Sequence, residues 1–200
     1  MTPIKTLDAL EEIYGTPAPK SLTKVVTQVT PHYRTWIEAS RFVVISTVGP
    51  EGTDGSPRGD DGAVVAIADE RTLLLPDWFG NNRIDTLRNI VRDERVSLMF
   101  MVPGEVNVVR INGTAIVSAD DDLRARFEKN GKQPRSVVAI TIGEMYFQCA
   151  KAVMRSKLWA GEAPSVKLPT AGEFLKERDA LFDAAGYDGA YPEYAKSRMW

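Results

Sequence analysis

The chain has 200 residues, enough for one well-buried domain with small appendages, and its 44% hydrophobic and 26% charged residues are typical of a globular protein. A net charge of -2 disfavours a general nucleic-acid binder, and a single cysteine excludes a disulfide framework or a cysteine-rich metal site. No apolar run approaches the roughly 20 residues that cross a bilayer, and the acidic N-terminus fits neither a signal nor a transit peptide. We therefore expect a cytoplasmic protein that binds neither nucleic acid nor membrane.

Residues 1–40 are expected to form a helical N-terminal extension. Apolar residues recur at helical spacing within 4–14, and a second helix is expected over 21–29. Thr30 followed by Pro31 predicts the start of a third helix, because proline is favoured at the first helical position.

Residues 41–160 are rich in valine, isoleucine and aromatic residues, which are typical of strands. The glycine- and proline-rich stretch 49–62 is expected to be a long hairpin connection, and 120–129, acidic at its start and basic at its end, a helix. About six short strands with few βαβ alternations fit a closed antiparallel barrel better than a doubly wound parallel sheet. The expected strands are 42–48, 63–68, 71–75, 96–102, 106–118 and 136–149.

Residues 161–200 are expected to form a C-terminal helical segment after a proline-bounded linker at 164–169. The aromatic stretch 187–200 is expected to pack back on the body of the protein or on a second subunit. One helix face is expected to carry four apolar residues: Phe174, Leu175, Leu181 and Phe182.

The stretch 72–91 predicts a strand, a tight turn and a helix. Pro76 is expected to end the strand, and Asn81 or Asn82 to cap the helix. Arg83 would then lie in the first turn, where unpaired N–H groups and the positive end of the helix favour an anion such as phosphate. The alternative is an ordinary capped helix with a solvated arginine.

Few residues support metal or nucleophilic chemistry. His32, the single histidine, begins an amphipathic helix and is expected at the surface or at a helix end. Cys149 follows an apolar strand and is expected to be a small buried thiol. Asp120, Asp121 and Asp122 are explained by a helix start. No metal site is expected, and no catalytic residue can be assigned.

The arginines are more informative. Arg58 ends the glycine-rich connection, Arg110 lies in a strand between valine and isoleucine and needs an anion or another partner, and Arg155 follows a strand. Several arginines at strand ends of one small barrel would form a pocket for a phosphorylated ligand, unless they are scattered surface residues paired with acids. Three aromatic residues offer flat surfaces for a ring: Trp78, Phe79 and Trp159.

The order of these segments resembles the pyridoxamine 5'-phosphate oxidase-like, FMN-binding split-barrel family over roughly residues 34–160. The resemblance rests on the strand 42–48 with its hairpin to Ser56-Pro57-Arg58, the strand-turn-helix 73–87, Arg-Ile-Asn-Gly at 110–113 and Arg-Ser-Lys-Leu-Trp at 155–159. It is strongest to the branch of FMN-dependent enzymes whose substrates are unassigned.

The resemblance implies an α+β fold with a six-stranded antiparallel split barrel, and a homodimer that binds FMN at the subunit interface. It implies a flavin-dependent oxidoreductase acting on an unidentified small molecule. The implied cofactor-binding residues are Arg58 toward the phosphate or ribityl end, Pro76 and Asp77 along the ring, Asn82 and Arg83 at the phosphate, and Asn107, Arg110, Arg155, Ser156 and Trp159 from the same or the other subunit.

The chain departs from the vitamin-making oxidases of this family. Asp60, Asp61 and Gly62 stand where a lysine is usual, and the C-terminal Trp…Arg-Leu-His signature is absent, so pyridoxamine phosphate oxidation is the less favoured activity. Two alternatives stay open, a split barrel that holds flavin or haem without turnover and a deazaflavin-dependent relative. A haem would have to be ligated by Cys149 or His32.

Overall fold

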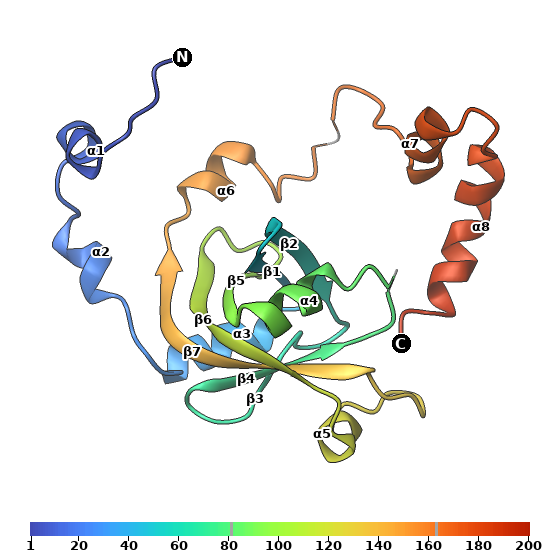
Figure 1. Ribbon diagram of the computed structural model, residues 1–200, viewed down its shortest axis with the longest axis horizontal. Helices are drawn as coiled ribbons and strands as arrows, with labels where there is room; N and C mark the ends of the chain where they lie inside the picture. The colour runs from blue at the N-terminus through green and yellow to red at the C-terminus, as the bar shows by residue number, and fades with distance from the viewer. Residues whose placement is uncertain (81, 163) are drawn as a thin grey trace.

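The chain folds around one twisted, seven-stranded antiparallel sheet, with helices on its faces and toward both ends of the chain (Figure 1). The computed structural model describes residues 1–80, 82–162 and 164–200. Hydrogen-bonded neighbours in the sheet follow the order β2-β1-β5-β6-β7-β4-β3. The strands are β1 (Phe42–Gly49), β2 (Gly52–Gly59), β3 (Ala66–Ile67), β4 (Thr72–Asp77), β5 (Arg95–Met101), β6 (Val108–Ser118) and β7 (Ser136–Gln148). The helices are α1 (Leu7–Tyr14), α2 (Pro19–Thr23), α3 (Pro31–Ala39), α4 (Asp85–Arg92), α5 (Asp121–Ala125), α6 (Lys151–Ser156), α7 (Ala171–Arg178) and α8 (Ala184–Lys196).

The sheet surrounds an apolar core because alternate residues of its strands are buried. In β5, Val96, Leu98 and Phe100 are buried at a period of two, while the residues between them are partly exposed. Ile37 of α3 and Ile90 of α4, 0% and 1% exposed, belong to the same core. The expected fold class, mainly β with flanking helices, is confirmed.

The predicted count of six strands is wrong, because β2 occupies the stretch expected to be a long connection. It pairs with β1 without interruption, from Gly49 opposite Gly52 to Phe42 opposite Gly59. Its glycines and Pro57 disguised the strand, yet these residues are tolerated because β2 is an edge of the sheet.

Three other elements differ from expectation in extent. Pro76 does not end β4, because it lies opposite Val137 of β7 and the pairing continues for one more residue. The second helix ends at Thr23, and Val26 instead forms a β-bridge with Met145. Helix α5 is also shorter than predicted. In the described part of the chain, no helix combines the length and the apolar character that crossing a bilayer would need.

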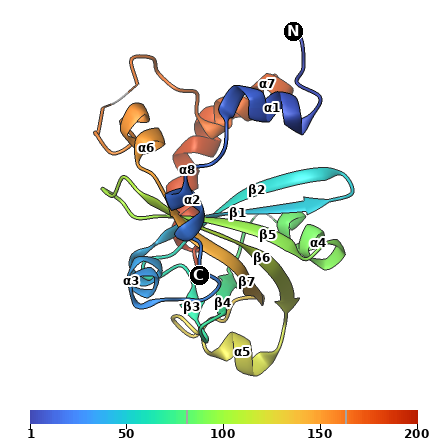
Figure 2. The ribbon, with the colours of Figure 1, turned by 90° about the vertical axis from the view of Figure 1, so that its left-hand side faces the viewer.

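The terminal helices α1 and α2, and α7 and α8, project from the sheet as two arms (Figures 1 and 2). Helix α7 starts with a capping box in which Thr170 and Glu173 exchange hydrogen bonds, and it ends at Arg178. The prediction that Leu181 shares one helix face with residues of α7 is therefore wrong. The expected division after residues 40 and 160 stays a prediction.

The last residues of the chain return to the body of the protein, as one of the two predicted alternatives required. The Trp200 ring packs edge-on against the Trp78 ring, with 5.8 Å between their centroids. The carbonyl oxygen of Trp200 accepts a hydrogen bond of 3.0 Å from Lys132 Nζ. The C-terminal arm is thus attached at its far end, beside the end of β4.

Candidate functional site

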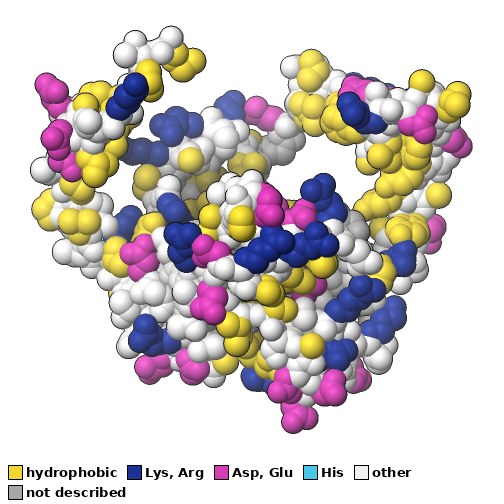
Figure 3. All heavy atoms as spheres, viewed as in Figure 1, with side chains coloured by type: hydrophobic (Ala, Val, Ile, Leu, Met, Phe, Trp, Pro, Cys, Tyr) yellow, Lys and Arg dark blue, Asp and Glu magenta, His cyan; other side chains and the backbone are white. Residues whose placement is uncertain are grey.

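A large cleft lies between the body of the protein and α8, and its volume is about 1020 Å³. This is at the upper end of the range, roughly 300–1,000 Å³, that small-molecule sites occupy. Its floor is formed by the ends of β2 and β4 and by the turn before α4, and its outer wall by the tyrosines of α8. The space-filling view shows open space between the body and the C-terminal arm (Figure 3).

Arg58 and Asp77 form a partly buried ion pair on the floor of the cleft. Arg58 Nη2 lies 3.7 Å from Asp77 Oδ1, and the two side chains are 23% and 19% exposed. Arg58 also donates hydrogen bonds to Ser56 Oγ and to the carbonyl oxygen of Pro57. Burial raises the pKa of Asp77 above its usual value, although the charges of Arg58 and Arg135 oppose this shift.

The pKa of Asp77 gives a prediction about stability. In the folded protein the pKa of Asp77 lies above its usual value of 3.8, so the stabilisation that the protonated carboxyl contributes is present below pH 3.8 and is lost as the pH rises through the folded-state pKa. We therefore expect Asp77→Asn to raise the melting temperature by a few degrees at pH 7 and to have no such effect below pH 3.8. Thermal unfolding at a series of pH values measures this. A variant that is less stable than the wild type at neutral pH would contradict it.

The turn before α4 differs from the predicted helix start. The N-cap residue is Ile84, the helix begins at Asp85, and Asn82 and Ile84 have positive φ angles of 60° and 52°. Arg83 therefore precedes the helix, and its Nε donates to Asp85 Oδ2 at 2.8 Å. The expected cap at Asn82 is wrong, and Asn81 lies outside the described residues. A β-branched residue such as Ile84 is strained at positive φ, and such strain often occurs at functional sites.

Two hydrogen bonds fix α4 and this turn against the neighbouring hairpin. Thr86 Oγ1 in the first turn of α4 donates to Asp54 Oδ2 of β2 at 2.6 Å. One turn later, Asn89 Nδ2 donates to Thr47 Oγ1 of β1 at 3.1 Å. The side chains that line the cleft from β2 and from the turn are thereby held in a fixed relation.

Arg135 was missed by the sequence analysis, yet it connects the two sides of the cleft. Its Nη1 donates to Asn82 Oδ1 at 2.8 Å, and its Cζ lies 4.4 Å from the centre of the Phe79 ring. Its backbone N–H donates to the carbonyl oxygen of Asp77, because it directly precedes β7, the neighbour of β4. The position of Arg135 in the cleft depends on the pairing of β4 with β7. It could not be predicted because the sequence did not reveal this pairing.

Half of the predicted site residues line this cleft: Arg58, Pro76, Asp77, Asn82 and Arg83. The others, Asn107, Arg110, Arg155, Ser156 and Trp159, do not line it within one chain. Arg110 of β6 lies opposite Tyr146, near the far end of β7, and Asn107 directly precedes β6. The other three follow β7 in the sequence. The contribution of all five from a second subunit stays a prediction.

Three of these residues have partners of their own. Arg110 Nη1 donates to Gln148 Oε1 at 3.2 Å. The partner that we expected for an arginine within a strand is therefore a neutral amide and not an anion. Trp159 Nε1 donates to the carbonyl oxygen of Glu105 at 2.8 Å, and Ser156 Oγ donates within its own helix.

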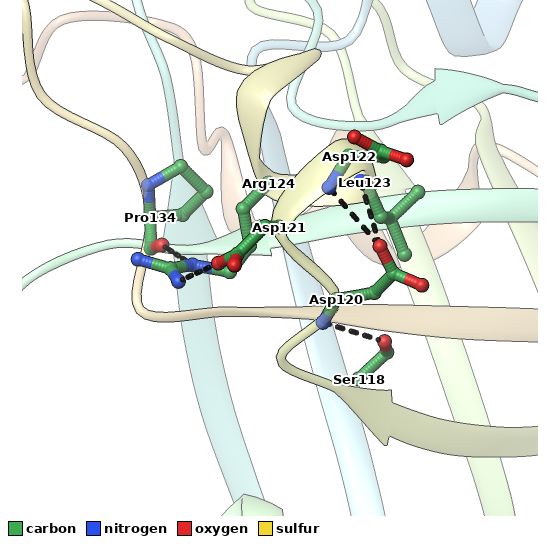
Figure 4. A network of polar contacts seen from close by, with 7 residues as sticks. All are labelled: Ser118, Asp120, Asp121, Asp122, Leu123, Arg124 and Pro134. Carbon is green, nitrogen blue, oxygen red and sulfur yellow. Dashed lines mark hydrogen bonds and ion pairs between the residues drawn. The ribbon is translucent and has the colours of Figure 1, made fainter.

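The remaining candidates for chemistry have structural explanations. His32 is exposed, as predicted, but Cys149 is also exposed because β7 ends just before it, so the prediction of a buried thiol is wrong. Asp120 caps α5 by accepting hydrogen bonds from the N–H groups of Asp122 and Leu123 (Figure 4). The described residues contain no cluster of three acidic, histidine or cysteine side chains that could hold a metal ion.

Comparisons with known proteins agree with this architecture. The sequence profile described as pyridoxamine 5'-phosphate oxidase matches residues 29–149, more than half of the chain. No protein with a curated description matches the sequence.

Among solved structures, a variant of HupZ from Group A Streptococcus matches 60% of this chain and 99% of its own, with 15% identity and a TM-score of 0.51. General Stress Protein 26 of Bacillus anthracis matches 57% of this chain and 88% of its own, with 16% identity and a TM-score of 0.45. A structure described as F420 reductase matches 58% and 98%, with 16% identity and a TM-score of 0.44. The first of these supports a shared fold.

Proposed function

The chain belongs to the pyridoxamine 5'-phosphate oxidase family, and from this premise we propose that its cleft binds a flavin, FMN in the first place, for oxidoreductase chemistry on a small molecule. One observation carries the proposal. The cleft brings Arg58, Asn82 and Arg83 together with the aromatic residues Trp78 and Phe79, although these residues come from different strands and turns.

The residues present fit such a group. Arginine and asparagine side chains suit a phosphate, and the rings of Trp78 and Phe79 suit a flat, aromatic ligand. Trp78 Nε1 is buried and has no hydrogen-bond partner among the described residues. A buried donor without a partner is costly, and the ring of a flavin carries oxygen and nitrogen acceptors that could satisfy it.

A bound flavin supplies hydride and electron transfer, and the protein supplies binding, orientation and electrostatics. In this chain, the positive charges of Arg58 and Arg135 favour negative charge on a ligand that lies beside them. Asp77, whose pKa is raised by burial, is the titratable side chain of the cleft that is best suited to hold a proton.

The proposal includes a homodimer. Segment 147–159 carries several exposed apolar side chains, which a second subunit would cover. They are Phe147, Met154, Leu158 and Trp159. The same segment contains Arg155, Ser156 and Trp159, three of the five predicted site residues that do not reach the cleft of their own chain, so one association would explain both observations.

The test is a titration of the purified protein with FMN, followed by flavin fluorescence and absorbance. Quenching and a shift of the flavin spectrum at micromolar concentration are the expected results. A colourless protein that takes up no added FMN would contradict the proposal. Parallel titrations with the deazaflavin F420 and with haem separate the alternative ligands, and reduction of the bound flavin by nicotinamide donors separates an enzyme from a flavin holder without turnover.

Arg83→Ala is expected to weaken FMN binding by roughly 1.5–3 kcal/mol, the range for a hydrogen bond to a charged group. Arg95→Ala is the matched control, because Arg95 and Arg83 are 72% and 76% exposed and each pairs with an aspartate two residues away. Arg95 does not line the cleft, so its replacement should leave the dissociation constant unchanged. Equal dissociation constants for the wild type and Arg83→Ala would show that the turn before α4 does not hold the phosphate.

A further inference from the structure

Two guanidinium groups lie against the Phe79 ring in the cleft. Arg135 Cζ lies 4.4 Å from the centre of the ring, and Arg198 Cζ lies 4.5 Å from it. The two side chains come from opposite walls, since Arg135 precedes β7 and Arg198 follows α8. Two positive charges therefore share one ring as a neighbour, and the repulsion between them favours the binding of an anion in this part of the cleft.

The acidic groups of the cleft compensate these two positive charges only in part, because the charge of Arg135 acts on Asp77 while Arg58 is the ion-pair partner of that carboxylate. Asp77 and Asp85 pair with Arg58 and Arg83, Asp60 pairs with Lys129, and Asp54 accepts a hydrogen bond from Thr86. Within the described part of the chain, no carboxylate lies within 4.0 Å of Arg135 or Arg198.

The contacts that Arg135 and Arg198 do make are with neutral groups. Arg135 donates to the amide oxygen of Asn82, and Arg198 donates to Tyr194 Oη. Because Tyr194 accepts this bond, its own O–H can still donate to a ligand. The charge of each guanidinium thus stays available to an anion, and a third donor lies beside them.

Arg198 is held at this place by the attachment of the chain end. Trp200 packs on Trp78, and Lys129 Nζ lies 4.3 Å from the centre of the Trp200 ring. Lys132 donates to the Trp200 carbonyl oxygen at 3.0 Å. These contacts fix the backbone two residues after Arg198. Little further conformational entropy is therefore lost when the Arg198 side chain is placed in the cleft.

We propose that Arg135 and Arg198 form a second anion-binding position of the cleft, which takes a phosphate or carboxylate group beside the Phe79 ring. Guanidinium groups bind such groups through paired N–H donors, and two of them from opposite walls would bind one anion together. The anion can belong to the bound flavin or to a separate acidic ligand. The position itself does not depend on a flavin, and inorganic phosphate is therefore a sufficient probe.

The test measures binding of inorganic phosphate at constant ionic strength through tryptophan fluorescence, because Trp78 and Trp200 lie at the site. Arg135→Gln and Arg198→Gln are each expected to weaken phosphate binding about tenfold, a loss of roughly 1.4 kcal/mol at one charged contact. Both side chains are exposed, so the variants should fold, and Arg95→Gln is the control that should change nothing. Unchanged phosphate binding in both cleft variants, or an equal loss in the control, would overturn the proposal.

A second arm compares FMN with riboflavin, which lacks the phosphate. If the two arginines bind the phosphate of the flavin, the variants weaken FMN binding and leave riboflavin binding unchanged. If they bind a separate acid, FMN affinity stays the same and phosphate still binds to the FMN-loaded protein. Both outcomes support the anion-binding position at Arg135 and Arg198, and they show whether the bound anion belongs to the flavin or to a separate ligand. A protein that binds phosphate through these arginines but takes up no flavin would contradict the proposed function alone.

Discussion

Replacing Arg58 with methionine is expected to weaken FMN binding by about 3 kcal/mol, the upper end of the range for a contact to a charged group. Arg58 is less exposed than Arg83, so solvent screens its charge less. The same change removes the partner of Asp77 and leaves that carboxylate in a partly buried place. We therefore also expect a loss of about 2 kcal/mol in the free energy of unfolding at pH 7.

The double variant Arg58→Met, Asp77→Asn separates these two effects. It removes both charges of the pair, so most of the lost stability should return, while FMN binding should stay weak. Denaturant unfolding and FMN titration of the three variants measure the two quantities independently. Recovery of FMN binding in the double variant would show that Arg58 acts only by neutralising Asp77 and does not contact the ligand.

Replacing Gly113 with alanine is expected to destabilise the fold by about 3 kcal/mol, at the top of the usual range for inserting a methyl group into packed structure. A Cβ atom on Gly113 would lie 2.0 Å from the carbonyl oxygen of Thr141 in β7. The register of β6 and β7 shifts between Asn112 and Gly113, and Gly143 is the extra residue of this bulge. Because the nearest atom belongs to the backbone, the strands themselves must move.

Thermal unfolding tests this, with an expected decrease of roughly 6–12 °C for a domain of this size. Gly62→Ala is the control, because a Cβ atom there meets nothing within 4 Å and the φ angle of Gly62 is not positive. Gly143→Ala should fall between the two, since its closest contact would be 3.2 Å. Equal melting temperatures for Gly113→Ala and the control would contradict the bulge geometry. The effect also explains why the Arg-Ile-Asn-Gly motif at 110–113 ends in glycine.

Strands that carry β-branched residues could be predicted from the sequence. The prediction failed for segments whose composition is not typical of strands but which pair with a neighbouring strand. Strand β5 was predicted nearly to its ends because its apolar residues alternate and a polar turn follows. Strand β2 was missed because an edge strand is held by backbone hydrogen bonds to β1 and does not need apolar side chains. The start of α4 was misplaced because the positive φ angles of Asn82 and Ile84 extend the turn by several residues.

The candidate site was predictable where it depends on one local segment or on the order of segments. Asn82 and Arg83 lie in the turn between β4 and α4, and the resemblance added Arg58 from the neighbouring hairpin. Arg135 and Arg198 could not be predicted, because they meet at Phe79 only through the pairing of β4 with β7 and the return of the chain after α8. Periodicity carries no information about either contact.

The most direct measurement of the central claim is a crystal structure of the protein grown with FMN. The expected result is density for the flavin in the cleft beside Trp78 and Phe79, with its phosphate within hydrogen-bond distance of Asn82 or Arg83 or between Arg135 and Arg198. Density for the flavin at another surface, or an empty cleft at saturating FMN, would contradict it.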